Sequence, residues 1–162
     1  MAFPEPLERL IHALEKFPGV GARSAERMAL HVLRSPREEV AELAMALRDA
    51  RIETMRCEQC GNVALQVRCP ICADQERDQG LVCVVEGPRE VEKMESAGVF
   101  TGTYHVLLEG FSPREGARPE SAAMRRLHAR VASGTVREIV LATAPDREGE
   151  GAAMLVVEEL RE

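Results

Sequence analysis

The sequence predicts an α+β chain built from several modules: a helical N-terminal region (1–56), a small four-cysteine zinc finger (57–80) and a C-terminal α/β domain (81–162). Three observations lead to this prediction. Apolar residues recur at helical spacing through the first third, four of the five cysteines cluster in the middle segment, and short apolar runs alternate with helical patterns after it. Alternating strands and helices predict a parallel sheet that is covered on its faces.

The N-terminal region is expected to contain three helices. Apolar residues follow Pro6 at helical spacing as far as Leu14, and Pro6 suits a first helical turn because its missing N–H would have no partner there. A second helix is expected after Gly21 as far as Arg34, and a third from Ser35-Pro36. The apolar residues of the third helix recur on one face: Val40, Leu43, Ala44 and Leu47.

The α/β domain is expected to contain three strands and three helices. Strands are predicted over 81–85, 104–108 and 138–142, and helices over 88–97, over 119–132 and from Gly149. A loop rich in Gly and Pro separates the second strand from the second helix. Cys83, inside the first strand, and Tyr104, at the start of the second, are expected to be structural. The four histidines lack the spacing of ligands or nucleophiles and are expected at the surface or in the core: His12, His31, His105 and His128.

The composition excludes several classes of protein. No apolar run approaches the roughly 18 residues of a membrane-spanning helix, and the N-terminus resembles no signal peptide, so a cytoplasmic protein without membrane contact is expected. A net charge of −6 argues against a generally basic nucleic-acid coat, and four Phe and one Tyr are too few for a base-stacking platform. Any contact with nucleic acid is therefore expected to be local, in the less acidic N-terminal third.

The strongest motif is a pair of Cys-x-x-Cys sequences separated by eight residues: Cys57, Cys60, Cys69 and Cys72. Each pair offers two thiolates to one tetrahedral ion, and the short loop between them lets the second pair complete the coordination. Disulfides and chance clustering of buried thiols are the alternatives, and a reducing cytosol disfavours the first. Four protein ligands leave no position for water, so one structural Zn²⁺ is predicted.

A second motif lies between the first two predicted helices. Gly19 and Gly21 permit a tight hairpin whose backbone N–H groups suit one phosphate at a helix N-terminus. Arg23 and Arg27, four residues apart, then lie on one helix face and can reach neighbouring phosphates. The hypothesis is DNA binding that does not depend on sequence, and the alternative is an ordinary helical corner with solvated arginines.

Acidic residues follow two of the predicted strands. Glu86 comes directly after the first strand, and Asp146, Glu148 and Glu150 come after the third. Ligands bind at the carboxyl ends of strands in open α/β sheets, so these carboxylates are candidates for one Mg²⁺ ion. The alternative is that the glutamates favour the N-terminus of the last helix through its dipole.

The order and spacing of these parts resemble the RecR family of bacterial recombination proteins along nearly all of the chain. The resemblance rests on the four-cysteine motif together with three stretches: Pro4–Leu10, the hairpin Pro18–Gly21, and the strand with its following turn, Leu81–Pro88. It implies a helix-hairpin-helix DNA-binding unit, a zinc finger and a Toprim domain. It also implies a role with RecO and RecF in loading RecA on single-stranded DNA, and homo-oligomeric rings able to encircle DNA.

The resemblance also assigns roles to residues. The four cysteines match the zinc ligands, Arg23 stands where the family usually has Lys, and Arg27 matches a family Arg in the DNA-contacting helix. Glu86 matches the Toprim glutamate after the first strand. Because the family's Toprim domain is a binding platform without known catalytic activity, a protein that is not an enzyme is expected.

Two departures from the family pattern bear on this expectation. The segment Ala144–Glu150 is similar to the Asp-x-Asp-x-x-Gly-Glu loop of topoisomerase-type Toprim domains, but Ala144 replaces the first aspartate, which disfavours phosphoryl transfer. Family members also continue past a final helix like this one, so we expect a Toprim domain that is incomplete at its C-terminus and an oligomer only if the short C-terminus permits it. The alternative function is a Mg²⁺-dependent nuclease or strand-transfer enzyme that uses Glu86, Asp146 and Glu148. A third possibility is a truncated protein that only binds partners.

Overall fold

The chain forms two compact units, Met1–Ile52 and Glu53–Glu162, which are described separately. We analysed a computed structural model, which describes residues 3–107 and 121–161. In the described part of the chain, no helix is long and apolar enough to cross a membrane.

The first unit contains the three predicted helices. Helix α1 (Glu5–Leu14) begins with Pro6 in its first turn and packs against α2 (Ala22–Arg34). The residues buried by the two helices are few and mostly small: Leu7, Ala25 and Ala29.

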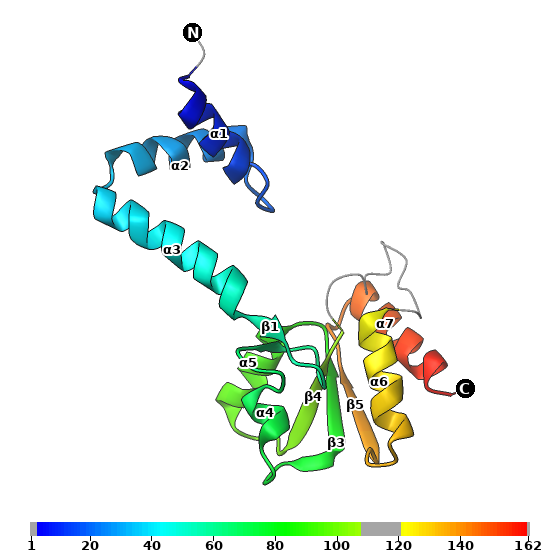
Figure 1. Ribbon diagram of the computed structural model, residues 1–162. Helices are drawn as coiled ribbons and strands as arrows, with labels where there is room; N and C mark the ends of the chain where they lie inside the picture. Colours follow the sequence, from blue (N-terminus) through cyan, green and yellow to red (C-terminus); the bar gives the residue numbers. More distant parts are fainter. Residues whose placement is uncertain (1–2, 108–120, 162) are drawn as a thin grey trace. The chain divides into compact units, whose positions relative to one another are not determined.

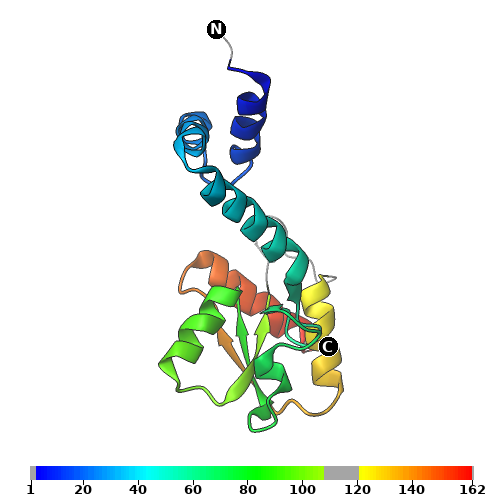
Figure 2. The same cartoon turned by 60° about the vertical axis from the view of Figure 1, so that its left-hand side comes forward.

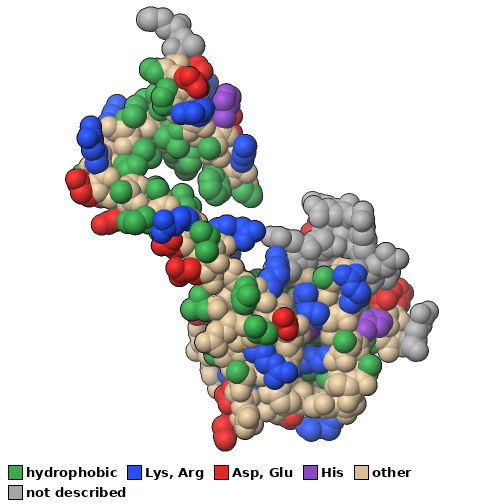
Figure 3. Space-filling model, viewed as in Figure 1, with side chains coloured by type: hydrophobic (Ala, Val, Ile, Leu, Met, Phe, Trp, Pro, Cys, Tyr) green, Lys and Arg blue, Asp and Glu red, His purple; other side chains and the backbone are tan. Residues whose placement is uncertain are grey.

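Helix α3 (Arg37–Glu53) has no buried residue. The apolar face predicted from the sequence therefore lies at the surface, with Leu43 52% and Leu47 57% exposed. Figure 3 shows apolar and charged side chains next to each other at the surface of this helix. An exposed apolar face on a helix is typical of a surface that packs against another molecule.

The four-cysteine segment has little regular structure. Its elements are the two-residue strands β1 (Met55–Arg56) and β2 (Val63–Ala64), which pair antiparallel, and the one-turn helix α4 (Pro70–Ala73). Its buried cluster consists of the four cysteines and Ala64, with Ile71 packed against them. This core is too small to stabilise the segment by apolar burial alone.

The rest of the second unit is built around a parallel sheet. The sheet has the strand order β4-β3-β5, and β3 pairs in parallel with both neighbours. The strands are β3 (Asp78–Val85), β4 (Gly102–Val106) and β5 (Glu138–Ala142). Figures 1 and 2 show helices on both faces: α5 (Pro88–Ala97) lies on one face, and α6 (Ala122–Ala132) and α7 (Arg147–Glu159) lie on the other.

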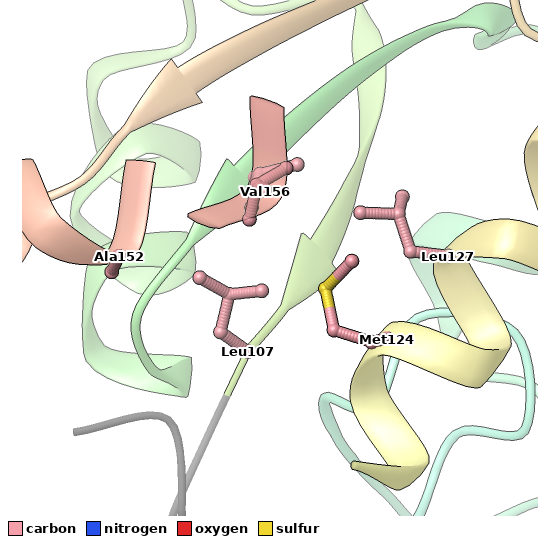
Figure 4. Packing of buried hydrophobic residues seen from close by; sticks show 6 residues of the cluster. Leu107, Met124, Leu127, Ala152 and Val156 are labelled. Carbon is pink, nitrogen blue, oxygen red and sulfur yellow. The ribbon is translucent and has the colours of Figure 1, made fainter. Parts of the chain in front are cut away.

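The side chains of β3 divide the core into two layers. Val84 packs in a cluster with residues of α6 and α7, which Figure 4 shows from close by: Met124 and Leu127 from α6, Ala152 and Val156 from α7, and Leu107. Cys83 and Val85 point to the opposite face and pack with Val91 of α5. Alternation along a strand that is buried on both faces produces this arrangement.

Both residues that were expected to be structural are in the core. Cys83 is fully buried, and burial raises the pKa of its thiol to about 11. The Tyr104 hydroxyl donates a hydrogen bond of 2.7 Å to Glu95, and burial is the main cause that raises its pKa. Arg77 pairs with the same carboxylate and donates to the Gly102 carbonyl at 3.0 Å. This network ties the end of the four-cysteine segment to α5 and β4.

Element boundaries differ from the prediction at strand and helix starts. Strand β3 begins at Asp78 instead of Leu81, and β4 begins at Gly102, two residues before Tyr104. Helix α7 begins at Arg147 because the Asp146 side chain caps it. Leu108, the Gly- and Pro-rich loop and the start of the predicted helix at 119 lie outside the described residues.

A buried histidine makes the stability of this unit depend on pH. His105 on β4 is fully buried; its Nε2–H donates to the Ala123 carbonyl at 3.0 Å, and Nδ1 has no partner. Burial lowers the pKa of His105 to about 4. The unfolded chain takes up this proton near pH 6.5 and the folded chain only near pH 4. The unit should therefore lose about 3 kcal/mol of stability as the pH falls through that window.

Denaturant unfolding of the wild type and of His105→Gln, repeated between pH 7.5 and pH 4, checks this expectation. Gln can keep the donor to Ala123 but cannot be protonated, so its stability should fall less with pH. An identical pH dependence in the two proteins would contradict the assignment.

Candidate metal centre and nucleic-acid interface

The structure brings the four predicted cysteines together. Their sulfur atoms all lie within 4.8 Å of one another, and all four side chains are buried. Cys57 and Cys60 follow β1, Cys69 precedes the first turn of α4, and Cys72 lies within that turn. Among the described residues, this is the one group of three or more His, Cys, Asp or Glu side chains that is arranged to bind a metal ion.

Backbone hydrogen bonds shape the first pair into a knuckle. The N–H of Gly61 donates to the Cys57 carbonyl at 2.9 Å, and the N–H of Cys57 donates to the Asn62 carbonyl at 2.8 Å. Gly61 has a φ of +78°, a conformation that favours glycine. The N–H of Asn62 then points at Cys60 Sγ over 3.5 Å. Such turns present two sulfur atoms to the same point in space.

The geometry of the group fits tetrahedral coordination. Metal–sulfur bonds of about 2.3 Å place two ligands of a tetrahedral zinc ion about 3.8 Å apart, and Cys60 and Cys69 have their sulfur atoms 3.6 Å apart. All four cysteines are free, and this distance is far too long for a disulfide bond.

The protonation of the four thiols supports the same conclusion. The hydrogen bond with Cys69 raises the pKa of Cys60 to about 12, whereas hydrogen bonds from Cys60 and Cys72 lower the pKa of Cys69 to about 2. Without a cation, the group therefore stabilises the Cys69 thiolate and disfavours the thiolates of Cys60 and Cys72. A divalent cation supplies the positive charge that allows all four to deprotonate.

The predicted DNA-binding hairpin is formed by Phe17–Gly21. Gly19 has a φ of +77°, but Gly21 has a φ of −90° and serves as the N-cap of α2. No side chain caps that helix end. The N–H of Ser24 donates to the Gly21 carbonyl at 2.9 Å, so the N–H groups of Ala22 and Arg23, which precede it, are the ones that this helix end offers to an anion.

Arg23 and Arg27 lie on one face of α2, where a cavity of about 460 Å³ is lined by residues of this helix alone: Arg23, Glu26, Arg27, Leu30, His31 and Arg34. Both arginines are exposed. The sequence argument missed Arg34 and His31. The helical period could have identified them, because positions 23, 27, 31 and 34 follow the same face.

The acidic residues have structural partners. Glu86 accepts a hydrogen bond of 3.0 Å from the N–H of Ala144, which ties the ends of β3 and β5 together. Asp146 accepts from the N–H groups of Glu148 and Gly149 at 3.0 and 2.8 Å and caps α7. Within the described residues, Glu86, Asp146 and Glu148 form no group suited to one metal ion. Asp146 is thus engaged at the helix N-terminus, as is typical of Asp at N-caps.

Comparison with known proteins matches most of the chain. The family model described as RecR, helix-hairpin-helix matches residues 7–51, and the Toprim domain model matches residues 80–162. The Recombination protein RecR of Moorella thermoacetica is 42% identical over 154 residues, which cover 95% of this chain and 77% of that relative. The protein of the same name from Desulforudis audaxviator is 42% identical over 161 residues, which cover 99% and 81% of the two chains. That from Pelotomaculum thermopropionicum is 44% identical over 152 residues, with coverage of 94% and 76%.

Proposed function

Because this chain belongs to the RecR family of recombination proteins, we propose that it binds the DNA backbone through α2 and needs one structural zinc ion to fold. Its function is recombinational repair. We propose that it acts as a mediator without catalytic activity, in the cytoplasm at the nucleoid. The observation that carries the proposal is the row of arginines beside the uncapped N-terminus of α2.

Three features of α2 favour contact with phosphates. Arg23, Arg27 and Arg34 project from one face, and Gly19 and Gly21 form the turn that leads to the helix N-terminus. Contacts to phosphates carry no base information, so the binding that we propose is indifferent to sequence. Because the whole chain has a net charge of −6, attraction to DNA requires a local basic surface, and the arginine face of α2 offers one.

The double substitution Arg23→Ala with Arg27→Ala tests the proposed surface. Affinity for duplex and single-stranded DNA should fall about tenfold or more, equally for different sequences, because two phosphate contacts are lost. The slope of log affinity against log salt should become shallower by about 2 units. Fluorescence anisotropy at several salt concentrations measures both quantities.

The matched control is the double substitution of Arg9 and Arg48 by Ala. Both arginines are exposed on helices of the first unit, but they pair with the carboxylates of Glu5 and Asp49. This control should leave the salt slope unchanged. Equal losses in both double variants would reject α2 as the contact surface and leave only a general charge effect.

We assign the four cysteines to zinc because four thiolates in a buried tetrahedral group are typical of structural zinc sites. The coordination shell has no position for water, so the ion would stabilise the fold and take no part in a reaction. The carboxylates of the Toprim domain have a structural role in this proposal. Its support is that Glu86 accepts a hydrogen bond from the N–H of Ala144 and Asp146 accepts one from the N–H of Gly149. The proposal includes three modules: the helical DNA-binding region (1–56), the zinc finger (57–80) and the Toprim domain (81–162).

The partners RecO and RecF and a homo-oligomeric ring are further parts of this proposal, which follow from the family resemblance. The exposed apolar face of α3 supports the oligomer. Leu43 and Leu47 lie at the surface there, and such a face is typical of helices that pack against a second copy of the chain.

A further inference from the structure

Helix α6 directs two arginines toward the four-cysteine centre. Arg126 lies against the first knuckle: a Cβ built on Gly61 would meet its Nη2 atom at 2.8 Å. Its Nε atom is buried and has no hydrogen-bond partner among the residues that the structure describes. Within the described residues, no carboxylate forms an ion pair with this guanidinium, although burial of a positive charge requires a negative partner.

Arg130, one helical turn further along α6, is only 9% exposed. It donates to the Tyr104 carbonyl at 2.7 Å and to the Thr103 hydroxyl, so its hydrogen bonds go to neutral groups of β4. It lines a cavity of about 700 Å³ together with Cys72 and Arg126. Its charge, too, has no carboxylate partner among the described residues.

Negative charge on the cysteines acts on both arginines. Burial lowers the pKa of each guanidinium, and negative charge on the cysteines opposes that effect: Cys60 and Cys57 act on Arg126, and Cys72 acts most strongly on Arg130. A backbone hydrogen bond of 2.8 Å from the N–H of Val106 to the Cys60 carbonyl holds the first knuckle against β4. The first knuckle therefore contacts β4 through this hydrogen bond and contacts α6 through the Arg126 side chain.

The charges of this arrangement balance. One divalent ion with four thiolates carries a net charge of −2, and the two guanidinium groups carry +2. A buried charge without a partner is strongly destabilising, whereas a buried charge with a hydrogen-bonded partner is tolerated. Outer groups of this kind are a common way in which proteins tune the affinity of a metal site.

We propose that Arg126 and Arg130 supply the counter-charge of the four-cysteine metal centre, so that the bound metal stabilises helix α6 on the sheet. The inference rests on the proposed metal site. Both arginines are positioning residues: they do not ligate the ion, but they lower the free energy of its thiolate complex. Loss of the metal leaves the buried Arg130 and the half-buried Arg126 opposite fewer thiolates than the metal complex holds, and it weakens the contact between the zinc finger and the Toprim domain.

Substitutions at Arg126 provide the first test. Arg126→Gln removes the charge, Arg126→Lys keeps it, and Arg125→Gln removes the same charge from an exposed neighbouring position on α6. The metal content of the purified full chain is measured first, and release of the metal to a colorimetric chelator is then followed. Arg126→Gln should release the metal about 10-fold faster than the wild type. Arg126→Lys should release the metal at a rate close to that of the wild type, because it keeps the charge. Arg125→Gln should release it at the wild-type rate.

Stability with and without metal gives a readout that a purely steric role would not move. Arg126→Gln should lower the unfolding midpoint of the metal-loaded protein but leave that of the metal-free protein unchanged or higher, because it then removes an uncompensated cation. Equal lowering in both states, release at the wild-type rate, or an equal effect of Arg125→Gln would overturn the inference. A chain that binds no metal at all would instead overturn the proposed zinc site.

Discussion

Replacement of Cys69 by Ser should leave the four-cysteine centre without its metal and unfold the segment that contains it. The buried cluster of this segment holds only the cysteines, Ala64 and the neighbouring Ile71, so apolar burial cannot replace the lost ligand. Structural zinc contributes on the order of 10 kcal/mol to the folding of small zinc modules. We therefore expect a metal content close to zero and a large decrease in the thermal unfolding midpoint, measured by metal analysis and calorimetry.

Cys83→Ala is the matched control, because Cys83 is also a buried thiol of the same unit but packs with Val91 of α5 and is not one of the four clustered cysteines. It should keep one metal ion per chain and lose only the stability expected from a smaller core side chain, about 1 kcal/mol. One metal ion per chain in the Cys69→Ser protein would contradict the assignment of four ligands.

Gly149→Ala, which adds a single methyl group, should strongly destabilise the Toprim domain. A Cβ at this position would lie 2.0 Å from the carbonyl oxygen and 2.7 Å from the nitrogen of Ala144. Both are backbone atoms, and Glu86 holds the same residue in place by accepting a hydrogen bond from the Ala144 N–H. Relief of the clash must move the loop between β5 and α7, at a cost of about 3 kcal/mol in the free energy of unfolding.

Gly87→Ala tests whether this cost comes from the backbone contact. Gly87 is the N-cap of α5 in the same unit, and its added Cβ would meet only the carboxylate end of Glu90, at 3.1 Å. That side chain can move, so the cost should be about 1 kcal/mol or less. Urea unfolding measures the free energy of unfolding of both variants. Similar decreases for the two would show that the close approach of Gly149 to Ala144 is not the cause of the destabilisation.

The elements were predictable where one local pattern decides them. Helix α5 and strand β5 have the predicted ends, since Pro88 starts the helix, Gly98 adopts a left-handed conformation after it, and apolar residues mark the strand. The start of β3 was not predicted, because Asp78 and Gln79 are polar. Asp78 joins the strand through its backbone, whose N–H donates to the Thr101 carbonyl at 3.0 Å, and its side chain forms an ion pair of 2.9 Å with Arg137.

In the candidate sites, too, the residues set by local spacing were predictable and those set by contacts between distant segments were not. The spacing of the cysteines was sufficient because each pair closes over two residues and the chain between the pairs is short. Helical spacing likewise predicted Arg23 and Arg27 on one face. The roles of Arg126 and Arg130 could not be predicted, since they follow from the packing of α6 against a knuckle more than 60 positions earlier in the chain. The position of Asp146 after a strand indicates a metal ligand, but its position directly before a helix is also a capping signal, and the structure shows the cap.

The hydrogen bonds around β4 have a consequence for solubility. Strand β4 is an edge of the sheet, and alternate residues of a strand direct their backbone groups to the same side. At its outer edge, Arg77 covers the Gly102 carbonyl, Arg130 covers the Tyr104 carbonyl, and the Cys60 carbonyl accepts from Val106. An open edge invites pairing with a foreign strand and aggregation. The four-cysteine segment and one arginine of α6 thus cover this edge, and we expect loss of the proposed metal to expose it as a template for self-association.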